Sequence, residues 1–221
     1  LNEKDAQHEN RRRQRQGKRL VEPLYSRNDA EKAMRQFQVL DYDVERKLLP
    51  GVQLRLQDAG HILGSAIVEL WLEENCERRK LVVSGDLGHA GAPILRNPEM
   101  VREADLVVLE STYGDREHRS WDATLTELGE VFRAARGSDG NILIPAFAIG
   151  RSQELIYFLK HHSREWGIKD WTIFLDSPMA IEATEVYTRH WKLFDAETPR
   201  RRKKDGDTFT MPNLHFSRTA A

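Results

Sequence analysis

Three short segments of the chain combine glycine with a side chain that could bind a metal ion or move a proton. They are centred on His61, Asp86 and Glu110, and each lies at the end of a predicted strand. His61 stands between Gly60 and Gly64, and glycine permits the tight backbone turns that bring an imidazole to a ligand. A lone histidine is more often structural than a ligand, so this segment by itself leaves both interpretations open.

The two carboxylates carry a similar ambiguity when each is taken alone. Asp86 lies between Gly85 and Gly88, where an aspartate either caps a turn or binds a metal ion. Glu110 ends an aliphatic run, and burying its charge unpaired would cost several kcal/mol, so it should contact a metal, a cation or water. Together with His61 they offer one imidazole nitrogen and two carboxylates at successive strand ends, a donor set that zinc accepts. A zinc-bound water ionises near neutrality and becomes a nucleophile for hydrolysis.

The elements that must position these residues are strands in the first half of the chain. Alternating apolar and polar residues predict strands over residues 52–56, 66–72 and 80–84, with a turn over 73–79. The aliphatic run within residues 105–110 predicts a strand that is buried on both faces. Two helices are predicted before these strands, over residues 1–20 and 29–37, the second with Asn28 or Asp29 as its N-cap.

The second half of the chain alternates between strand and helix patterns. Strands are predicted over residues 141–145 (short and buried), 171–175 and 214–218, and helices over 121–136, 150–162 and 178–189. Ser120 suits the N-cap of the first of these helices, and Pro178 suits the first turn of the last. His161 and His162 end the middle helix, where an imidazolium would complement the helix dipole. This alternation favours parallel strands joined by crossover helices, which is an α/β fold.

Composition limits the classes of protein to consider. The chain has 221 residues, a net charge of -1, 39% hydrophobic and 31% charged residues, so it can bury a core. No stretch approaches eighteen apolar residues, which excludes a membrane-spanning helix of ordinary length. A single cysteine, Cys76, excludes an internal disulfide framework and a cysteine-rich zinc site, and it favours a cytoplasmic setting. Because the chain opens at Leu1 and not at methionine, we expect a fragment of a longer protein.

Two segments concentrate positive charge despite the balanced total. Residues 1–20 hold seven basic against three acidic residues, and Arg200–Lys204 is a run of five basic residues followed closely by Asp205 and Asp207. Each is either a solvated surface segment or one that attracts the phosphates of a nucleic acid.

Five motifs, in this order along the chain, resemble the β-CASP branch of the metallo-β-lactamase fold. They are GHILGSA (60–66), SGDLG (84–88), LESTYG (109–114), PAFAIGRSQEL (145–155) and LDSPMA (175–180). The resemblance implies an α/β fold with part of an αββα metallo-β-lactamase sandwich over residues 1–118. Residues 119–221 would then form part of an inserted Rossmann-like α/β β-CASP domain.

The resemblance also implies an activity, which is zinc-dependent hydrolysis of RNA phosphodiester bonds in RNA processing or decay. His61 would bind one of two zinc ions, Asp86 would bridge both, and Glu110 would orient a ligand or assist proton transfer. Five further residues are expected to contact RNA phosphates: Ser111, Thr112, Arg151, Ser152 and Ser177. Of these, Arg151 and Ser152 follow a glycine at a strand-to-helix turn, where helix N–H groups and an arginine favour an anion.

The sequence lacks several of the metal-binding motifs that are typical of the family. The His-x-His-x-Asp-His metal motif and the later β-CASP histidine motifs are absent, so we expect an internal fragment with an incomplete zinc site and no activity of its own. Two alternatives stay open, a non-catalytic RNA-binding or scaffold subunit and a small-molecule metallo-hydrolase. The presence of His61, Asp86 and Glu110 favours catalysis, and the motif at residues 109–114 favours RNA over a small molecule. DNA is an alternative substrate, and the sequence gives no oligomeric state.

Overall fold

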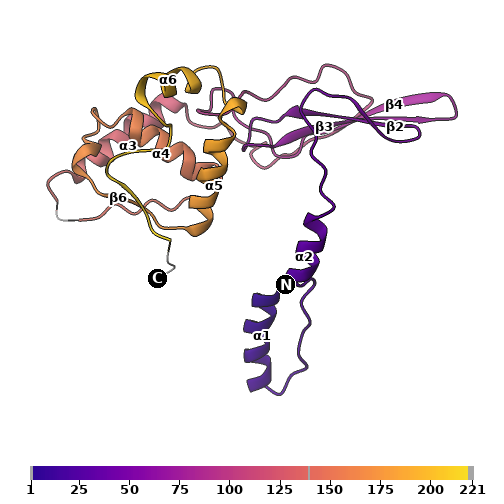
Figure 1. Cartoon of the computed structure of the whole chain (residues 1–221), viewed down its shortest axis with the longest axis horizontal. Coiled ribbons are helices and arrows are strands. Elements are labelled where there is room, and N and C mark those ends of the chain that lie inside the picture. Colours follow the sequence, from indigo (N-terminus) through magenta and orange to yellow (C-terminus); the bar gives the residue numbers. More distant parts are fainter. Residues whose placement is uncertain (1, 139, 219–221) are drawn as a thin grey trace. The chain divides into compact units, whose positions relative to one another are not determined.

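The computed structural model describes residues 2–138 and 140–218 and divides into two compact units, Leu1–Asp41 and Tyr42–Ala221 (Figure 1). A domain boundary near residue 118, within the second unit, stays a prediction.

The first unit contains the two predicted helices, α1 (Glu3–Arg15) and α2 (Arg27–Met34). The N-cap prediction for α2 was wrong, because Ser26 holds that position. The Ser26 hydroxyl accepts from the N–H of Asp29, while the Asp29 carboxylate accepts from the N–H of Ser26. This reciprocal capping box satisfies two N–H groups at once and starts the helix two residues before Asn28.

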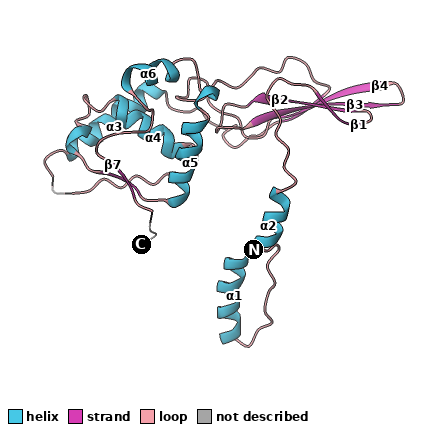
Figure 2. Ribbon diagram, viewed as in Figure 1, coloured by secondary structure: helices cyan, strands magenta, loops and turns pink. Residues whose placement is uncertain are grey.

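The strands of the second unit form a five-stranded sheet in the order β1-β2-β3-β4-β5 (Figure 2). The strands are β1 (Arg46–Leu49), β2 (Val52–Asp58), β3 (Ala66–Glu74), β4 (Glu77–Val83) and β5 (Leu106–Val108). Strands β1 to β4 pair with one another in antiparallel fashion, and β5 pairs in parallel with β4. Strands β3 and β4 meet in a two-residue turn at Asn75 and Cys76, both with positive φ, so the turn is shorter than the one predicted over residues 73–79.

Two strand predictions fail where the sheet ends. The prediction that residues 105–110 are buried on both faces was wrong, because β5 is an edge strand whose only partner among the described residues is β4, and Leu106 is 61% exposed. Residues 141–145 form no strand, and Leu143 is 92% exposed. No strand within residues 2–138 and 140–218 pairs with that segment, so its backbone forms no β-ladder although its residues are aliphatic.

The helical part of the second unit confirms most of the predicted elements. It contains α3 (Trp121–Ala135), α4 (Arg151–His161), β6 (Ile173–Leu175), α5 (Pro178–Arg189), α6 (Thr198–Asp205) and β7 (Leu214–Phe216), with short 3₁₀ turns at Ile168–Asp170 and Trp191–Leu193. Ser120 caps α3 as predicted, and Pro178 opens α5. Strands β6 and β7 pair in parallel, as the alternation of strand and helix indicated. The basic run at residues 200–204 lies in α6, not in a loop.

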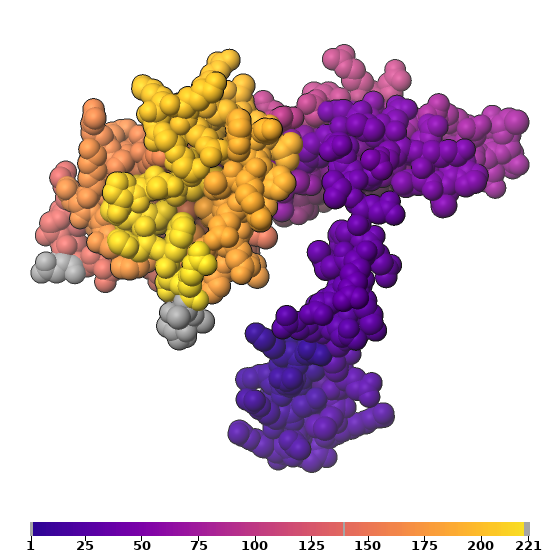
Figure 3. All heavy atoms as spheres, viewed as in Figure 1, coloured from indigo at the N-terminus to yellow at the C-terminus, as the bar shows by residue number. Residues whose placement is uncertain are grey.

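A hydrophobic core holds this helical part together. Its largest fully buried side chain is Trp166, which stacks on Phe132 of α3, and Ile94 joins the same cluster from the loop that follows β4. The space-filling view shows the last residues, in yellow, lying directly against the orange residues of α5 (Figure 3). Phe209 and Met211 account for this contact, because they are buried in the same core as Tyr187 of α5. None of the helices in the described ranges has the length and apolar character needed to cross a membrane.

Candidate active site

The loop that carries His61 is a tight turn between β2 and β3. Gly60 and Gly64 both have positive φ (63° and 91°), which a side chain would strain. The Ser65 hydroxyl accepts hydrogen bonds from the N–H groups of His61 (3.1 Å) and Ile62 (3.3 Å) and so closes the turn. The imidazole of His61 is exposed at the end of the sheet, in the tight turn that the flanking glycines predicted.

The loop that carries Asp86 touches the His61 loop through the backbone. The N–H of Gly88 donates to the carbonyl of Ala59 (2.8 Å), and a Cβ at Gly88 would lie only 1.7 Å from the Gly60 carbonyl oxygen. This close approach brings Asp86 Oδ2 to 4.0 Å from His61 Nε2. The structure therefore brings together the two side chains predicted as metal ligands.

Replacing Gly88 with alanine is expected to separate these loops. Because the new methyl group would meet backbone atoms that cannot rotate away, we expect a loss of about 3 kcal/mol in the free energy of unfolding. Chemical denaturation of Gly88→Ala measures this loss. Gly114→Ala is the matched control, since its nearest atom would be 3.4 Å away and its stability should change by less than about 1 kcal/mol. Equal stability of the two variants would contradict the close approach.

Glu110 follows β5 and ties its own loop to the Asp86 loop. Its Oε1 accepts from the N–H of Leu87 (2.9 Å) and its Oε2 from the N–H of Thr112 (3.2 Å). Its pKa is lowered, first by a hydrogen bond from the Thr112 side chain and then by the two N–H groups. Glu110 is therefore a carboxylate at neutral pH and can accept a proton or a hydrogen bond beside Asp86.

The described residues supply part of a metal site. His61 and Asp86 are exposed donors of the types that zinc accepts, and they converge on one space, so both fit a zinc ligand set. A catalytic zinc takes three protein ligands. Within residues 2–138 and 140–218, no group of three or more histidine, cysteine, aspartate or glutamate side chains could hold a metal ion.

The five residues predicted to contact phosphate lie in different environments. Ser111 is exposed, and Thr112 donates to Glu110. Ser152 is buried and its hydroxyl donates to the Phe147 carbonyl (2.7 Å), while Ser177 caps α5 by accepting from the N–H of Ala180 (3.2 Å). These contacts give Thr112, Ser152 and Ser177 structural roles. Their contact with phosphate stays a prediction.

Arg151 and Glu154 lie together in the first turn of α4. The Arg151 guanidinium is exposed and lies 2.9 Å from a Glu154 carboxylate oxygen. Glu154 belongs to the motif at residues 145–155, but no role was predicted for it. Its position in a first turn is ordinary for a glutamate, so no local signal marks its burial.

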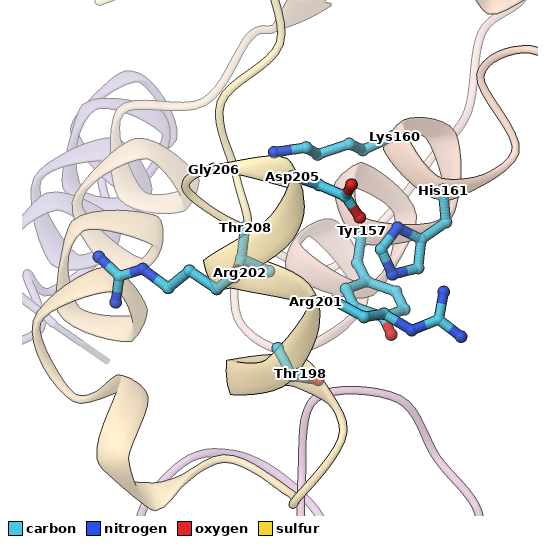
Figure 4. Close-up of a pocket in the computed structure, with 9 residues that line it drawn as sticks. All are labelled: Tyr157, Lys160, His161, Thr198, Arg201, Arg202, Asp205, Gly206 and Thr208. Atoms are coloured by element: carbon cyan, nitrogen blue, oxygen red, sulfur yellow. The ribbon is translucent and has the colours of Figure 1, made fainter.

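A small cavity between α4 and α6 has room for about one water molecule and is lined by none of the predicted site residues (Figure 4). His161 lies on its wall, and burial, followed by the nearby Arg201, lowers the pKa of His161 to about 4. Its buried Nε2 has no hydrogen-bond partner among the described residues. The prediction of an imidazolium at this helix end was therefore wrong for His161, which is neutral at neutral pH.

Comparison of the chain with known proteins identifies a family and several relatives. The model of the Beta-Casp domain matches residues 152–221. Ribonuclease TTHA0252 of Thermus thermophilus is 37% identical over 178 residues, which is 80% of this chain and 40% of that protein. The transcription termination factor FttA of Thermococcus kodakarensis is 34% identical over 77% of this chain and 26% of its own length. An RNase J-like protein of Methanocaldococcus jannaschii is 31% identical over 74% of this chain and 38% of its own length.

The chain thus spans two fifths or less of the length of these relatives. The similarity nevertheless covers the His61, Asp86 and Glu110 loops together with α3 and α4, since an alignment over about three quarters of the chain must include its middle. The resemblance inferred from the five motifs is confirmed, and the chain belongs to the β-CASP family of the metallo-β-lactamase superfamily.

Proposed function

We propose that the intact protein hydrolyses phosphodiester bonds of RNA with the help of zinc, in cytoplasmic RNA processing or decay. The observation that carries this proposal is the convergence of His61 and Asp86, 4.0 Å apart, beside the ionised carboxylate of Glu110. Two of the relatives are named as a ribonuclease and an RNase J-like protein, which supports RNA as the substrate.

In this proposal each residue of the site has a separate task. His61 and Asp86 supply an imidazole nitrogen and a carboxylate oxygen to the metal, and other segments of the intact protein supply the remaining ligands. Bound zinc would provide a water that ionises near neutrality. Glu110 would accept a proton from such a water or orient it, because hydrogen bonds from Leu87 and Thr112 fix its carboxylate. The exposed guanidinium of Arg151 contacts a phosphate of the RNA.

Removal of metal from the intact protein tests this function. We expect treatment with a zinc chelator to lower the cleavage of a labelled single-stranded RNA on the order of 100-fold or more, and added zinc to restore it. Elemental analysis before and after the treatment confirms the removal. Full cleavage by the metal-free protein would refute the role of zinc, and no RNA cleavage with any divalent metal would refute the function itself. A DNA of the same sequence shows which nucleic acid is preferred.

A further inference from the structure

Tyr42 is distant from the candidate site in the sequence but contacts the loop that carries His61. Its hydroxyl donates to the carbonyl of Ser65 (2.8 Å), a residue 23 positions further along the chain. The Tyr42 side chain is half-buried, and burial, followed by the charge of Asp58, raises the pKa of Tyr42 to about 12. The hydroxyl therefore keeps its proton at neutral pH and can donate it to Ser65.

Ser65 joins the two ends of the His61 loop through its hydroxyl and its carbonyl. The hydroxyl accepts from the N–H groups of His61 (3.1 Å) and Ile62 (3.3 Å). The carbonyl accepts from the N–H of Ala59 (3.2 Å) in addition to the Tyr42 hydroxyl. Because a hydroxyl and a carbonyl oxygen have two lone pairs each, these four hydrogen bonds use the whole acceptor capacity of Ser65.

The same hydrogen bonds continue to the Asp86 loop through Ala59. This residue is fully buried, and while its N–H donates to Ser65, its carbonyl accepts from the N–H of Gly88 (2.8 Å). Gly88 follows Asp86 by two residues. One buried residue therefore connects the support of the His61 loop to the backbone that carries Asp86.

The His61 loop depends on such support because of its glycines. Gly60 and Gly64 both have positive φ, and glycine loses more conformational freedom on folding than any other residue. The His61 side chain is 43% exposed, so its direction depends largely on the backbone that carries it. Contacts that hold this backbone therefore also hold the imidazole.

We propose that Tyr42 and Ser65 are positioning residues that fix the backbone of the His61 loop and keep the imidazole opposite Asp86. Both act through His61 and contact neither metal nor RNA. Two ligands that are already held together bind a cation more tightly than two on a loose loop, because less freedom is lost on binding. The consequence for zinc binding and RNA cleavage rests on the function proposed above, whereas the order of the loop does not.

Two variants of the intact protein, Tyr42→Phe and Ser65→Ala, test this role against the control Tyr25→Phe. The control removes the same oxygen atom from a tyrosine that is 54% exposed. We expect the zinc affinity to fall about 3- to 10-fold in Tyr42→Phe, the effect of one lost hydrogen bond, and further in Ser65→Ala, which loses two. Saturating zinc should restore kcat in both variants, and KM for RNA should stay unchanged. Zinc affinities equal to that of the control would overturn the positioning role.

The order of the loop is measured separately, in the metal-free protein. Hydrogen–deuterium exchange of the peptide that covers residues 57–66 should become about 3- to 10-fold faster in both variants, while peptides of α4 keep the wild-type rate. Unchanged exchange over residues 57–66 in Tyr42→Phe, which alone decides if Ser65→Ala does not fold, would overturn the proposal whatever the activity. Faster exchange there would support it even if the wild type bound no zinc, a result that would refute only the proposed function.

Discussion

Glu110→Gln in the intact protein is expected to lower the rate of RNA hydrolysis by about 10²- to 10⁴-fold, the range for loss of a general acid–base group. Both oxygens of Glu110 accept from backbone N–H groups, at Leu87 and Thr112. A glutamine would turn its NH₂ group toward one of these donors, so it would lose a hydrogen bond as well as the charge. The loss should appear in kcat, because Glu110 lies beside the metal ligands and not in a separate RNA-binding surface.

The pH dependence of the wild type provides a second check on Glu110. The hydrogen bonds lower its pKa below the ordinary value of 4.5, so protonation of this group should reduce the rate only at a pH below 4.5. Glu117→Gln makes the same chemical change at an exposed position of the same segment and should leave the rate within roughly threefold of the wild type. If Glu110→Gln behaved like this control, Glu110 would have no part in the reaction.

Glu69→Gln is expected to cost about 3 kcal/mol of unfolding free energy, the lower end of the range for breaking a buried ion pair. Glu69 of β3 is fully buried and pairs with Arg55 of β2 (2.6 Å) and Lys80 of β4 (2.5 Å). Both cations also flank the ring of Trp71, at 5.3 Å and 5.2 Å from its centre. Neutralising Glu69 would leave two partly buried cations side by side without their shared counter-charge.

The contribution of Glu69 should also depend on pH. Burial opposes its ionisation, but the hydrogen bonds and charges of Arg55 and Lys80 outweigh burial and lower its pKa. A group with a lowered pKa in the folded state stabilises the protein above its unfolded value of 4.5, and this stability is lost as the pH falls through the folded value. The stability difference between wild type and Glu69→Gln should therefore be largest near neutral pH and shrink in acid.

Chemical denaturation at neutral and at acidic pH measures both effects. Glu73→Gln is the control, because it lies on the same strand and is exposed. A Glu69→Gln variant as stable as this control at neutral pH would show that the ion pairs contribute nothing.

Much of the fold could be predicted because the signals are local. Ser120 before α3 and Pro178 at the start of α5 involve neighbouring residues only, and both were confirmed, as was the parallel pairing of β6 with β7. The order of the five motifs likewise pointed to the β-CASP family, which the comparisons show. The glycines around His61 and Asp86 indicated tight turns, and the positive φ angles of Gly60, Gly64 and Gly85 bear this out.

The predictions that were wrong failed because they depended on contacts between distant parts of the chain. An aliphatic run predicts burial only if another element covers it, and in this structure the residues of β5 and the segment at 141–145 have no such cover. Glu69 and Trp71 gave no sequence signal, because their charged partners come from the neighbouring strands β2 and β4.

The sequence by itself determined which chemical groups this protein carries and the turns and helices on which they lie, because side-chain type, capping and glycine act over a few residues. Only the tertiary structure decided which of those groups meet. The approach of Gly88 to Gly60 sets the 4.0 Å between His61 and Asp86, and the hydrogen bond from Leu63 to Tyr187 joins the loop after His61 to α5. Contacts of this kind depend on backbone surfaces that fit over long sequence separations, which no local pattern of residues encodes.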